Sequence, residues 1–186
     1  MSDPLDYVFD ESLEFTLRWE GGYSDHPDDP GGATNMGVTQ GTYDGYRERT
    51  GRPLRPVLDI TETERDTIYR DQYWKAAGCD QQSVFSPMIA MVQFDAAVNV
   101  GVNRSTKWLQ GVVRSNRDGV YGPMTHEGFS VRLDEIGEDG MADQLLTKRE
   151  EWYVYLRDKP APANFGVFYN GWMNRVGALR EELGVV

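Results

Sequence analysis

Cysteine, positive charge and long apolar runs are all scarce in this chain. Its 186 residues include a single cysteine, Cys79, so no internal disulfide can form and folding does not depend on an oxidising compartment. No run approaches the length of a membrane-spanning helix, and residues 1–6 lack the basic and apolar parts of a secretory signal peptide. We therefore expect synthesis in the cytoplasm without a signal peptide, and no insertion into a membrane.

The balance of charge excludes a further class of partner. Lysine and arginine together number 19, against 30 aspartates and glutamates, which gives a net charge of −11. Because phosphate binding depends on clustered basic side chains, we expect no nucleic acid partner. The two histidines, His26 and His126, are not brought together by any pattern, so we expect no metal and no other cofactor. The remaining composition is typical of a globular protein, which we expect to be a monomer.

Apolar residues recur at helical spacing from the start of the chain. The repeat of Phe9, Leu13 and Leu17 predicts a first helix with Asp10 as its N-cap, ended by the glycine pair that follows Glu20. The stretch after that pair is rich in glycine, proline and aspartate, which predicts a loop containing at most a short hairpin.

Later helices are predicted from their boundary signals. Thr61 and Glu64 match a capping box, Ser86 precedes a proline at a first helical position, and Asn103 is a further candidate N-cap. The sequence therefore predicts a mostly α fold with about seven helices. The helical stretches expected after the first are 41–49, 61–74, 87–100, 103–113, 123–136, 142–157 and 165–183.

The segment that begins at Glu20 carries the most chemical information. It reads Glu-Gly-Gly-Tyr-Ser-Asp-His-Pro-Asp-Asp-Pro-Gly-Gly-Ala-Thr-Asn-Met-Gly-Val-Thr. Hydrolysis of a glycosidic bond requires a proton donor beside the leaving oxygen and, in most enzymes, a second carboxylate. The end of a helix and the neighbouring rings of Trp19 and Tyr23 would both favour the protonated acid. On spacing alone, Glu20 could equally be a surface glutamate in a last helical turn.

This segment resembles the signature of glycoside hydrolase family 108, which contains phage endolysins and bacterial secretion muramidases. In that family a Glu-Gly-Gly-Tyr opens a stretch that continues through Asp-Pro-Gly-Gly-Ala-Thr-Asn to Gly-Ile/Val-Thr. Residues 68–74, 94–101 and 170–175 are also similar to family motifs, and residues 109–110 and 118–125 resemble a peptidoglycan-binding module. The resemblance implies a lysozyme-like fold, with a catalytic part at 1–90 and a helical, peptidoglycan-binding-like part at 91–186 packed as one unit.

The resemblance also implies an activity and a setting. The substrate would be bacterial peptidoglycan, cleaved by an N-acetylmuramidase at the β-1,4 bond between N-acetylmuramic acid and N-acetylglucosamine. The protein would act on the cell wall after release by a holin or another export system. A lytic transglycosylase that forms 1,6-anhydro products, and a wall-binding or phage structural protein without activity, remain alternatives.

Three residues are candidates for catalysis. The resemblance makes Glu20 the general acid. Asp29 is a candidate second carboxylate, although an aspartate before Pro-Gly-Gly also suits a turn. Thr34 could position a water molecule or form a turn hydrogen bond. If Asp29 lies across a cleft from Glu20, it can activate water, and we then expect inversion at the anomeric carbon.

Four residues are candidates for substrate binding: Tyr23, Tyr43, Asn99 and Tyr121. The tyrosines could stack on sugar rings, but most aromatic residues in a chain of this kind belong to the core. Asn99 shares a helix face with Asp95, four residues earlier, so the pair predicts either a buried polar network or part of a cleft. Because protein and wall are both anionic, we expect local groove contacts rather than long-range attraction to dominate binding.

Overall fold

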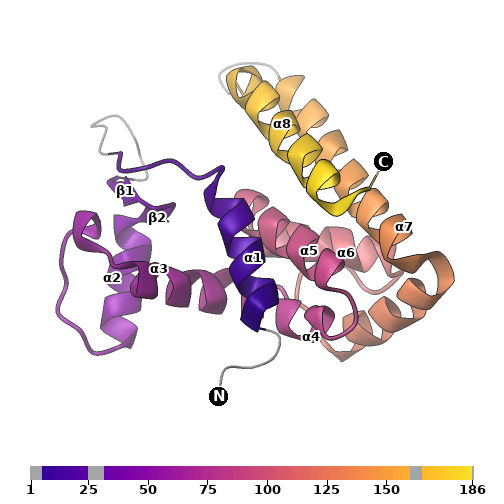
Figure 1. The fold of residues 1–186 in the computed structure, drawn as a ribbon, viewed down its shortest axis with the longest axis horizontal. Helices are drawn as coiled ribbons and strands as arrows, with labels where there is room; N and C mark the ends of the chain where they lie inside the picture. The colour runs from indigo at the N-terminus through magenta and orange to yellow at the C-terminus, as the bar shows by residue number, and fades with distance from the viewer. Residues whose placement is uncertain (1–5, 25–31, 160–164, 186) are drawn as a thin grey trace.

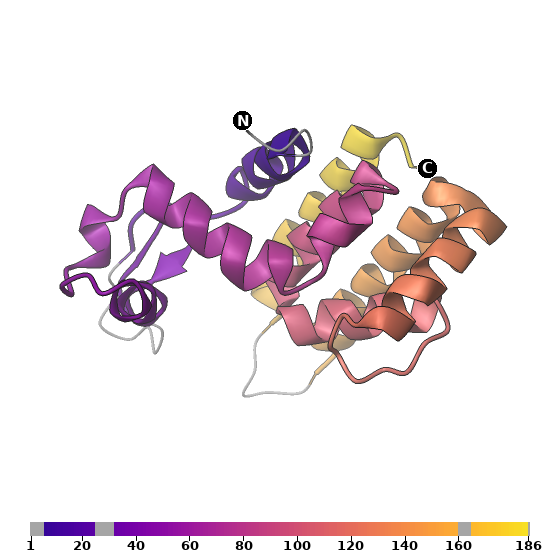
Figure 2. The ribbon, with the colours of Figure 1, turned by 90° about the horizontal axis from the view of Figure 1, so that it is seen from below.

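The structure, a computed structural model, describes residues 6–24, 32–159 and 165–185 and contains two lobes (Figure 1). The hairpin and the helices α2 and α3 form the smaller lobe, and helices α4 to α8 form the larger one; the view in Figure 2 separates them most clearly. In chain order the elements are α1 (Asp6–Leu17), β1 (Thr34–Asn35), β2 (Val38–Thr39), α2 (Gln40–Arg49), the 3₁₀ helix η1 (Val57–Asp59), α3 (Glu62–Tyr69), the π-helix η2 (Arg70–Lys75), α4 (Cys79–Ser83), α5 (Pro87–Val100), α6 (Val102–Val112), α7 (Pro123–Arg157) and α8 (Gly166–Leu183). The mostly α fold class is confirmed.

Helix boundaries with strong local signals are confirmed. The Thr61 side chain accepts a hydrogen bond from Glu64 N, and the Glu64 carboxylate accepts one from Thr61 N, which completes the capping box of α3. The Ser86 side chain caps α5 through Ile89 N, and the helix ends at Gly101. The predicted break near 137–141 is present, because Gly137 has φ 71° and divides α7 into two helical parts.

Two predicted helix starts are wrong. Asp10 lies inside α1, which begins at Asp6, because the buried face of this helix extends back to Val8 and Phe9. Asn103 lies inside α6, whose N-cap is Gly101.

The ends of two predicted helices also differ. The first helix ends at Leu17 rather than at Glu20, which lies in the turn that follows. The predicted helix 61–74 changes at Arg70 into a π-helix. Its wider turn places Tyr69 and Trp74, five residues apart, in the same core, where each is 1% exposed.

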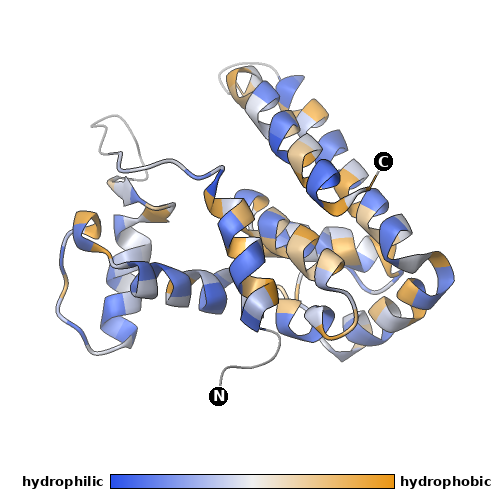
Figure 3. Ribbon diagram, viewed as in Figure 1, coloured by the Kyte–Doolittle hydropathy of each residue, from blue (hydrophilic) through white to orange (hydrophobic). Residues whose placement is uncertain are grey.

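Two hydrophobic clusters share the helices α1 and α5. Phe9 and Phe94 belong to the cluster of the smaller lobe, whereas Phe15 and Ile89 belong to that of the larger lobe. Figure 3 shows apolar and polar segments alternating along α1 and α7, as expected of helices with one buried face. The expected boundary after residue 90 falls within α5, and the wall-binding role of 91–186 stays a prediction.

In the part of the chain that the structure describes, no helix has both the length and the apolar character needed to cross a membrane.

Candidate active site

Glu20 lies where α1 gives way to the hairpin of the smaller lobe. Its backbone N–H donates to Leu17 O at 3.2 Å, and its side chain is 22% exposed. The hairpin turn packs directly against it: a Cβ on Gly37 would lie 3.2 Å from Glu20 Cγ and 2.1 Å from the hydroxyl oxygen of Tyr69. Gly37 also has φ +74°, so both space and conformation require glycine there. The turn therefore fixes one side of the Glu20 carboxyl group.

An arginine from the far end of the chain fixes the other side. Arg175, in α8, donates from Nη1 to Glu20 Oε1 at 2.9 Å. The same guanidinium binds Asp95 of α5, with Nη2 2.7 Å and Nε 3.0 Å from Oδ1. Arg175 and Asp95 are 4% and 0% exposed. The carboxylate of Glu20 is thus attached through Arg175 to the central helix.

Asp95 is the centre of a buried network. Arg149 of α7 donates to its Oδ2 at 2.5 Å, and the Thr16 hydroxyl donates to its Oδ1 at 3.0 Å. Burial alone would raise the pKa of Asp95, but the charges of Arg149 and Arg175 outweigh burial and hold the pKa at about 2. Asp95 therefore stays ionised and keeps both arginines in place.

Asn99 continues this network toward solvent. Arg149 Nε donates to the Tyr153 hydroxyl at 2.7 Å, and that hydroxyl donates to Asn99 Oδ1. The helix face shared by Asp95 and Asn99 thus serves both roles that the sequence left open: Asp95 belongs to the buried network, and Asn99 lines a cavity beside Glu20.

This cavity, the Glu20 hollow, has a volume of about 310 Å³. Exposed apolar side chains surround its polar floor: Val167 and Phe168 of α8 are 66% and 56% exposed, and Trp19 is 36% exposed. Such surfaces suit the faces of sugar rings, and the nearby carboxyl and amide groups can bind hydroxyls. The residues that line the hollow are Trp19, Glu20, Asn99, Val167, Phe168, Gly171, Trp172 and Arg175.

Two tyrosines of the smaller lobe are electrostatically linked to Glu20. Burial, and after it the negative charge of Glu20, raises the pKa of both Tyr69 and Tyr73. The Tyr69 hydroxyl donates to Met36 O at 3.3 Å and so ties α3 to the hairpin turn. Both hydroxyls therefore remain protonated at neutral pH.

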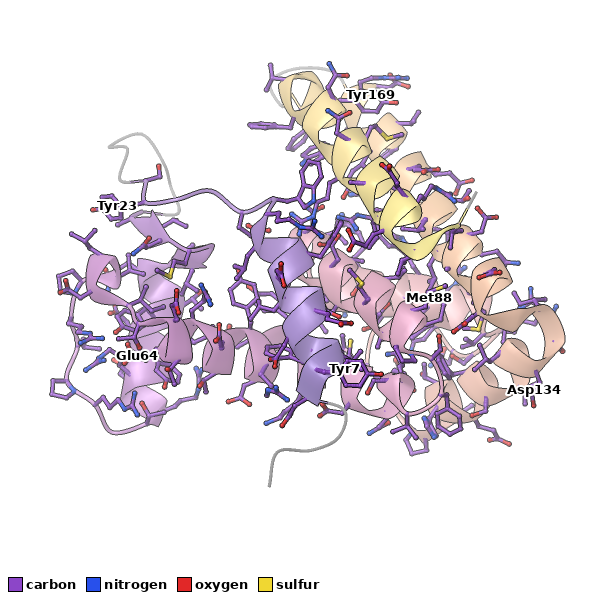
Figure 4. The ribbon with its side chains drawn as sticks, in the orientation of Figure 1. Tyr7, Tyr23, Glu64, Met88, Asp134 and Tyr169 are labelled. Atoms are coloured by element: carbon purple, nitrogen blue, oxygen red, sulfur yellow. The ribbon has the colours of Figure 1, made fainter. Side chains whose placement is uncertain are left out.

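The remaining candidates for catalysis lie in or beside the hairpin. Thr34 begins β1, is bridged to Ser24 by backbone hydrogen bonds of 2.8 and 2.9 Å, and donates from its hydroxyl to Gly32 O at 3.4 Å. Its side chain thus forms the turn contact considered above. Tyr23 is 49% exposed and lies on the side of the smaller lobe (Figure 4). Asp29 lies outside the described residues.

Two of the predicted binding tyrosines lie away from the Glu20 hollow. Tyr43 is 0% exposed; its hydroxyl donates to Glu64 at 2.8 Å and accepts from Arg55 at 2.7 Å. Its ring belongs to the core of the smaller lobe and has no surface for a sugar. Tyr121 lies against Gly78, and its hydroxyl is 3.1 Å from His126 Nδ1, so the side chain serves packing between α4 and α7.

Among the residues that the structure describes, no cluster of three or more histidine, cysteine, aspartate or glutamate side chains could hold a metal ion.

Comparison with known proteins adds a family to this geometry. Residues 13–101 match the family model described as glycosyl hydrolase 108. The solved structure titled "Structure of Brucella abortus SagA" is 30% identical, with a TM-score of 0.74, over 96% of this chain and 94% of that chain. This chain belongs to the glycosyl hydrolase 108 family. No curated protein sequence matches it.

Membership of the glycosyl hydrolase 108 family makes the chain a glycoside hydrolase. The matched residues 13–101 contain Glu20, Asp95 and Asn99, whereas Arg149 and Arg175 lie beyond them. Sequence reasoning did not assign a role to either arginine. The Gly-Trp-Met-Asn-Arg run that ends at Arg175 was the available signal, since it resembles a family motif, but spacing alone could not connect it to Glu20.

Proposed function

We propose that this glycoside hydrolase is an N-acetylmuramidase that cleaves the β-1,4 bond between N-acetylmuramic acid and N-acetylglucosamine in peptidoglycan, with Glu20 as general acid. The observation that carries the proposal is the position of Glu20: its carboxyl group lies in a hollow rimmed by aromatic and aliphatic side chains of α8 and of the turn after α1. Release by a holin or another export system would bring the protein to the wall.

The contacts of Glu20 support a role as proton donor. Arg175 binds Oε1, whereas Oε2 has no hydrogen bond to any residue that the structure describes, so Oε2 is the atom available to carry the proton. Asp95 accepts several hydrogen bonds from Arg175. The same guanidinium therefore holds the Glu20 carboxyl group in a fixed position relative to the buried Asp95.

In this proposal the second catalytic carboxylate comes from the segment between Tyr23 and the hairpin. Asp29 would activate the water, and Thr34 would help to hold it, which leads to inversion. In support, Ser24 and Thr34, which flank the segment containing Asp29 in the sequence, are hydrogen-bonded to each other. Exposed rings such as Tyr23, Trp19 and Phe168 would stack on the sugars.

The variant Glu20→Gln tests the role of the general acid. An amide cannot donate the proton that the leaving oxygen requires, so we expect the release of reducing ends from purified sacculi to fall by at least about a hundredfold. Glu11→Gln is the matched control, since Glu11 is an exposed glutamate of α1. Near-normal release by Glu20→Gln, with the fold intact by circular dichroism, would remove Glu20 from catalysis.

The products identify the reaction. Hydrolysis adds one water at the cleaved bond, whereas a lytic transglycosylase leaves a 1,6-anhydro end that is lighter by one water. Mass spectrometry of the wild-type digest therefore separates the two reactions. Anhydro products would show that the protein is a lytic transglycosylase and not a muramidase. Binding to sacculi without any product would instead indicate a wall-binding protein.

A further inference from the structure

A cationic groove lies on the larger lobe, lined mainly by side chains of α6 and of the second part of α7. We define it by the cations Arg104, Arg117, Lys148 and Lys159 and the rings of Trp108, Trp152 and Tyr155. Two cavities of about 410 and 390 Å³ form it, and both are lined by Trp152.

The groove continues into the Glu20 hollow through shared side chains. Asn99 and Trp172 line both that hollow and the 390 Å³ cavity. From there Trp152 leads into the 410 Å³ cavity with Arg117 and Lys148. A polymer bound at Glu20 can therefore extend over one row of adjoining cavities into the groove.

The groove is locally positive in a protein of net charge −11. Among the described residues, its four cations form no ion pair, and Glu151 is the single acidic side chain that lines either cavity. Elsewhere, by contrast, Arg47, Arg52 and Arg55 all pair with Glu64. The positive charges of the groove are therefore available to bind an anionic ligand.

Aromatic rings contact two of these cations, Arg104 and Lys159. The guanidinium carbon of Arg104 lies 3.6 Å from the centre of the Trp152 ring, and Lys159 Nζ lies 4.9 Å from that of Tyr155. The Trp152 and Tyr155 rings are themselves in contact, with centroids 5.1 Å apart. A stacked guanidinium keeps its N–H edge available to a carboxylate, while the neighbouring rings offer surface to sugars or peptide.

We propose that the cationic groove binds the carboxylates of the peptide side chains on a peptidoglycan strand whose sugars occupy the Glu20 hollow. The inference rests on the proposed function and adds a second recognition site to it. A strand that alternates sugar rings with anionic peptides matches a row of cavities that is aromatic beside Glu20 and cationic farther along. A densely charged polyphosphate fits less well, because the protein as a whole would repel it.

Binding without turnover tests this site. The full chain carrying Glu20→Gln is titrated with soluble glycan–peptide fragments of two or three disaccharide units, with the same fragments after amidation of their carboxylates, and with the fragments after removal of the peptides. Adding Arg117→Gln and Lys148→Gln should raise the Kd for the unmodified fragment by roughly three- to tenfold, with little change for the other two.

The matched control removes the same charge elsewhere. Lys75→Gln with Arg114→Gln takes away two exposed cations that pair with Asp71 and Glu135, outside the groove. This control should bind all three probes as the parent protein does. Equal Kd values for the groove pair and the control pair, or equal binding of amidated and unmodified fragments by the parent protein, would overturn the proposal.

Two further outcomes are decisive. If the groove pair weakens binding to phosphatidylglycerol vesicles but not to the wall fragment, the groove serves an anionic lipid surface and the proposal fails. The release of reducing ends by the wild-type protein is measured separately. A wild type that binds through the groove but releases nothing would refute the proposed function and leave this site intact.

Discussion

Arg175 links Glu20, at the hollow, to the buried core. Its guanidinium spans from Glu20 to Asp95, and Asp95 is in turn fixed by Arg149. A planar fork with five N–H donors can make all of these contacts at once, whereas an ammonium group cannot. With Glu20 as the proposed general acid, Arg175 would be a positioning residue that acts on the reaction through Glu20.

Replacing this arginine should separate positioning from charge. Arg175→Lys keeps the positive charge but loses the fork, so we expect kcat on sacculi to fall roughly ten- to a hundredfold with a small change in KM. Arg180→Lys is the control, because Arg180 lies on the same helix and pairs with Asp143 and Glu150 instead. Activity is measured at a temperature below the melting temperature of both variants, so that both are folded. An Arg175→Lys protein with wild-type kcat would show that Glu20 does not need this contact.

The elements of the smaller lobe are joined by one buried carboxylate. Glu64 caps α3, receives the Tyr43 hydroxyl from α2, and pairs with Arg55 in the loop between them. Burial alone would raise the pKa of Glu64, but hydrogen bonds from Thr61 N and Tyr43 and the charge of Arg55 lower it from 4.5 to about 2. The hairpin that supports Glu20 belongs to this lobe.

The low pKa of Glu64 predicts how stability depends on pH. Because the pKa is lower in the folded state, the stabilisation is present above about pH 4.5 and is lost as pH falls toward about 2. Over that shift it amounts to at most roughly 3 kcal/mol. Glu64→Gln should therefore have a lower melting temperature than wild type at neutral pH, and the difference should shrink near pH 3.

Glu62→Gln is the control for that comparison, since Glu62 is exposed on the same helix. It should follow the wild-type melting curve at every pH. A gap between wild type and Glu64→Gln that stays constant from neutral to acidic pH would assign the effect to lost packing rather than to ionisation.

Across the whole molecule, charge is unevenly distributed. The net charge of −11 would repel an anionic wall, while the cationic groove would attract it locally. These opposing effects should leave lysis of sacculi only weakly sensitive to salt, with less than about a tenfold change between low and physiological ionic strength. Initial rates of turbidity loss over a salt series check this. A steep fall would mean that long-range attraction drives binding.

Features set by neighbouring residues could be predicted from the sequence. The capping box at Thr61 and the glycine that ends α5 depend on contacts within a few positions, so the local sequence pattern predicts both. The family signature at Glu20 is likewise one continuous run. Asp95 and Arg175, in contrast, meet across 80 positions, and no periodicity connects them. Tyr43 illustrates the same difficulty, because Glu64, 21 positions away, provides the buried partner that its hydroxyl requires.

The sharing of α5 between both cores has a consequence for how such proteins can be recombined. The segment that matches the family model ends at Gly101, immediately after α5. This position would therefore be an obvious junction for replacing the downstream half with that of a related protein. Yet Asp95, on the upstream side, is buried between two arginines contributed by α7 and α8. A chimera joined after Gly101 would leave the ionised carboxylate of Asp95 buried without a charged partner, unless the new downstream half placed two guanidinium groups at the same position. The two halves are therefore constrained to be inherited together.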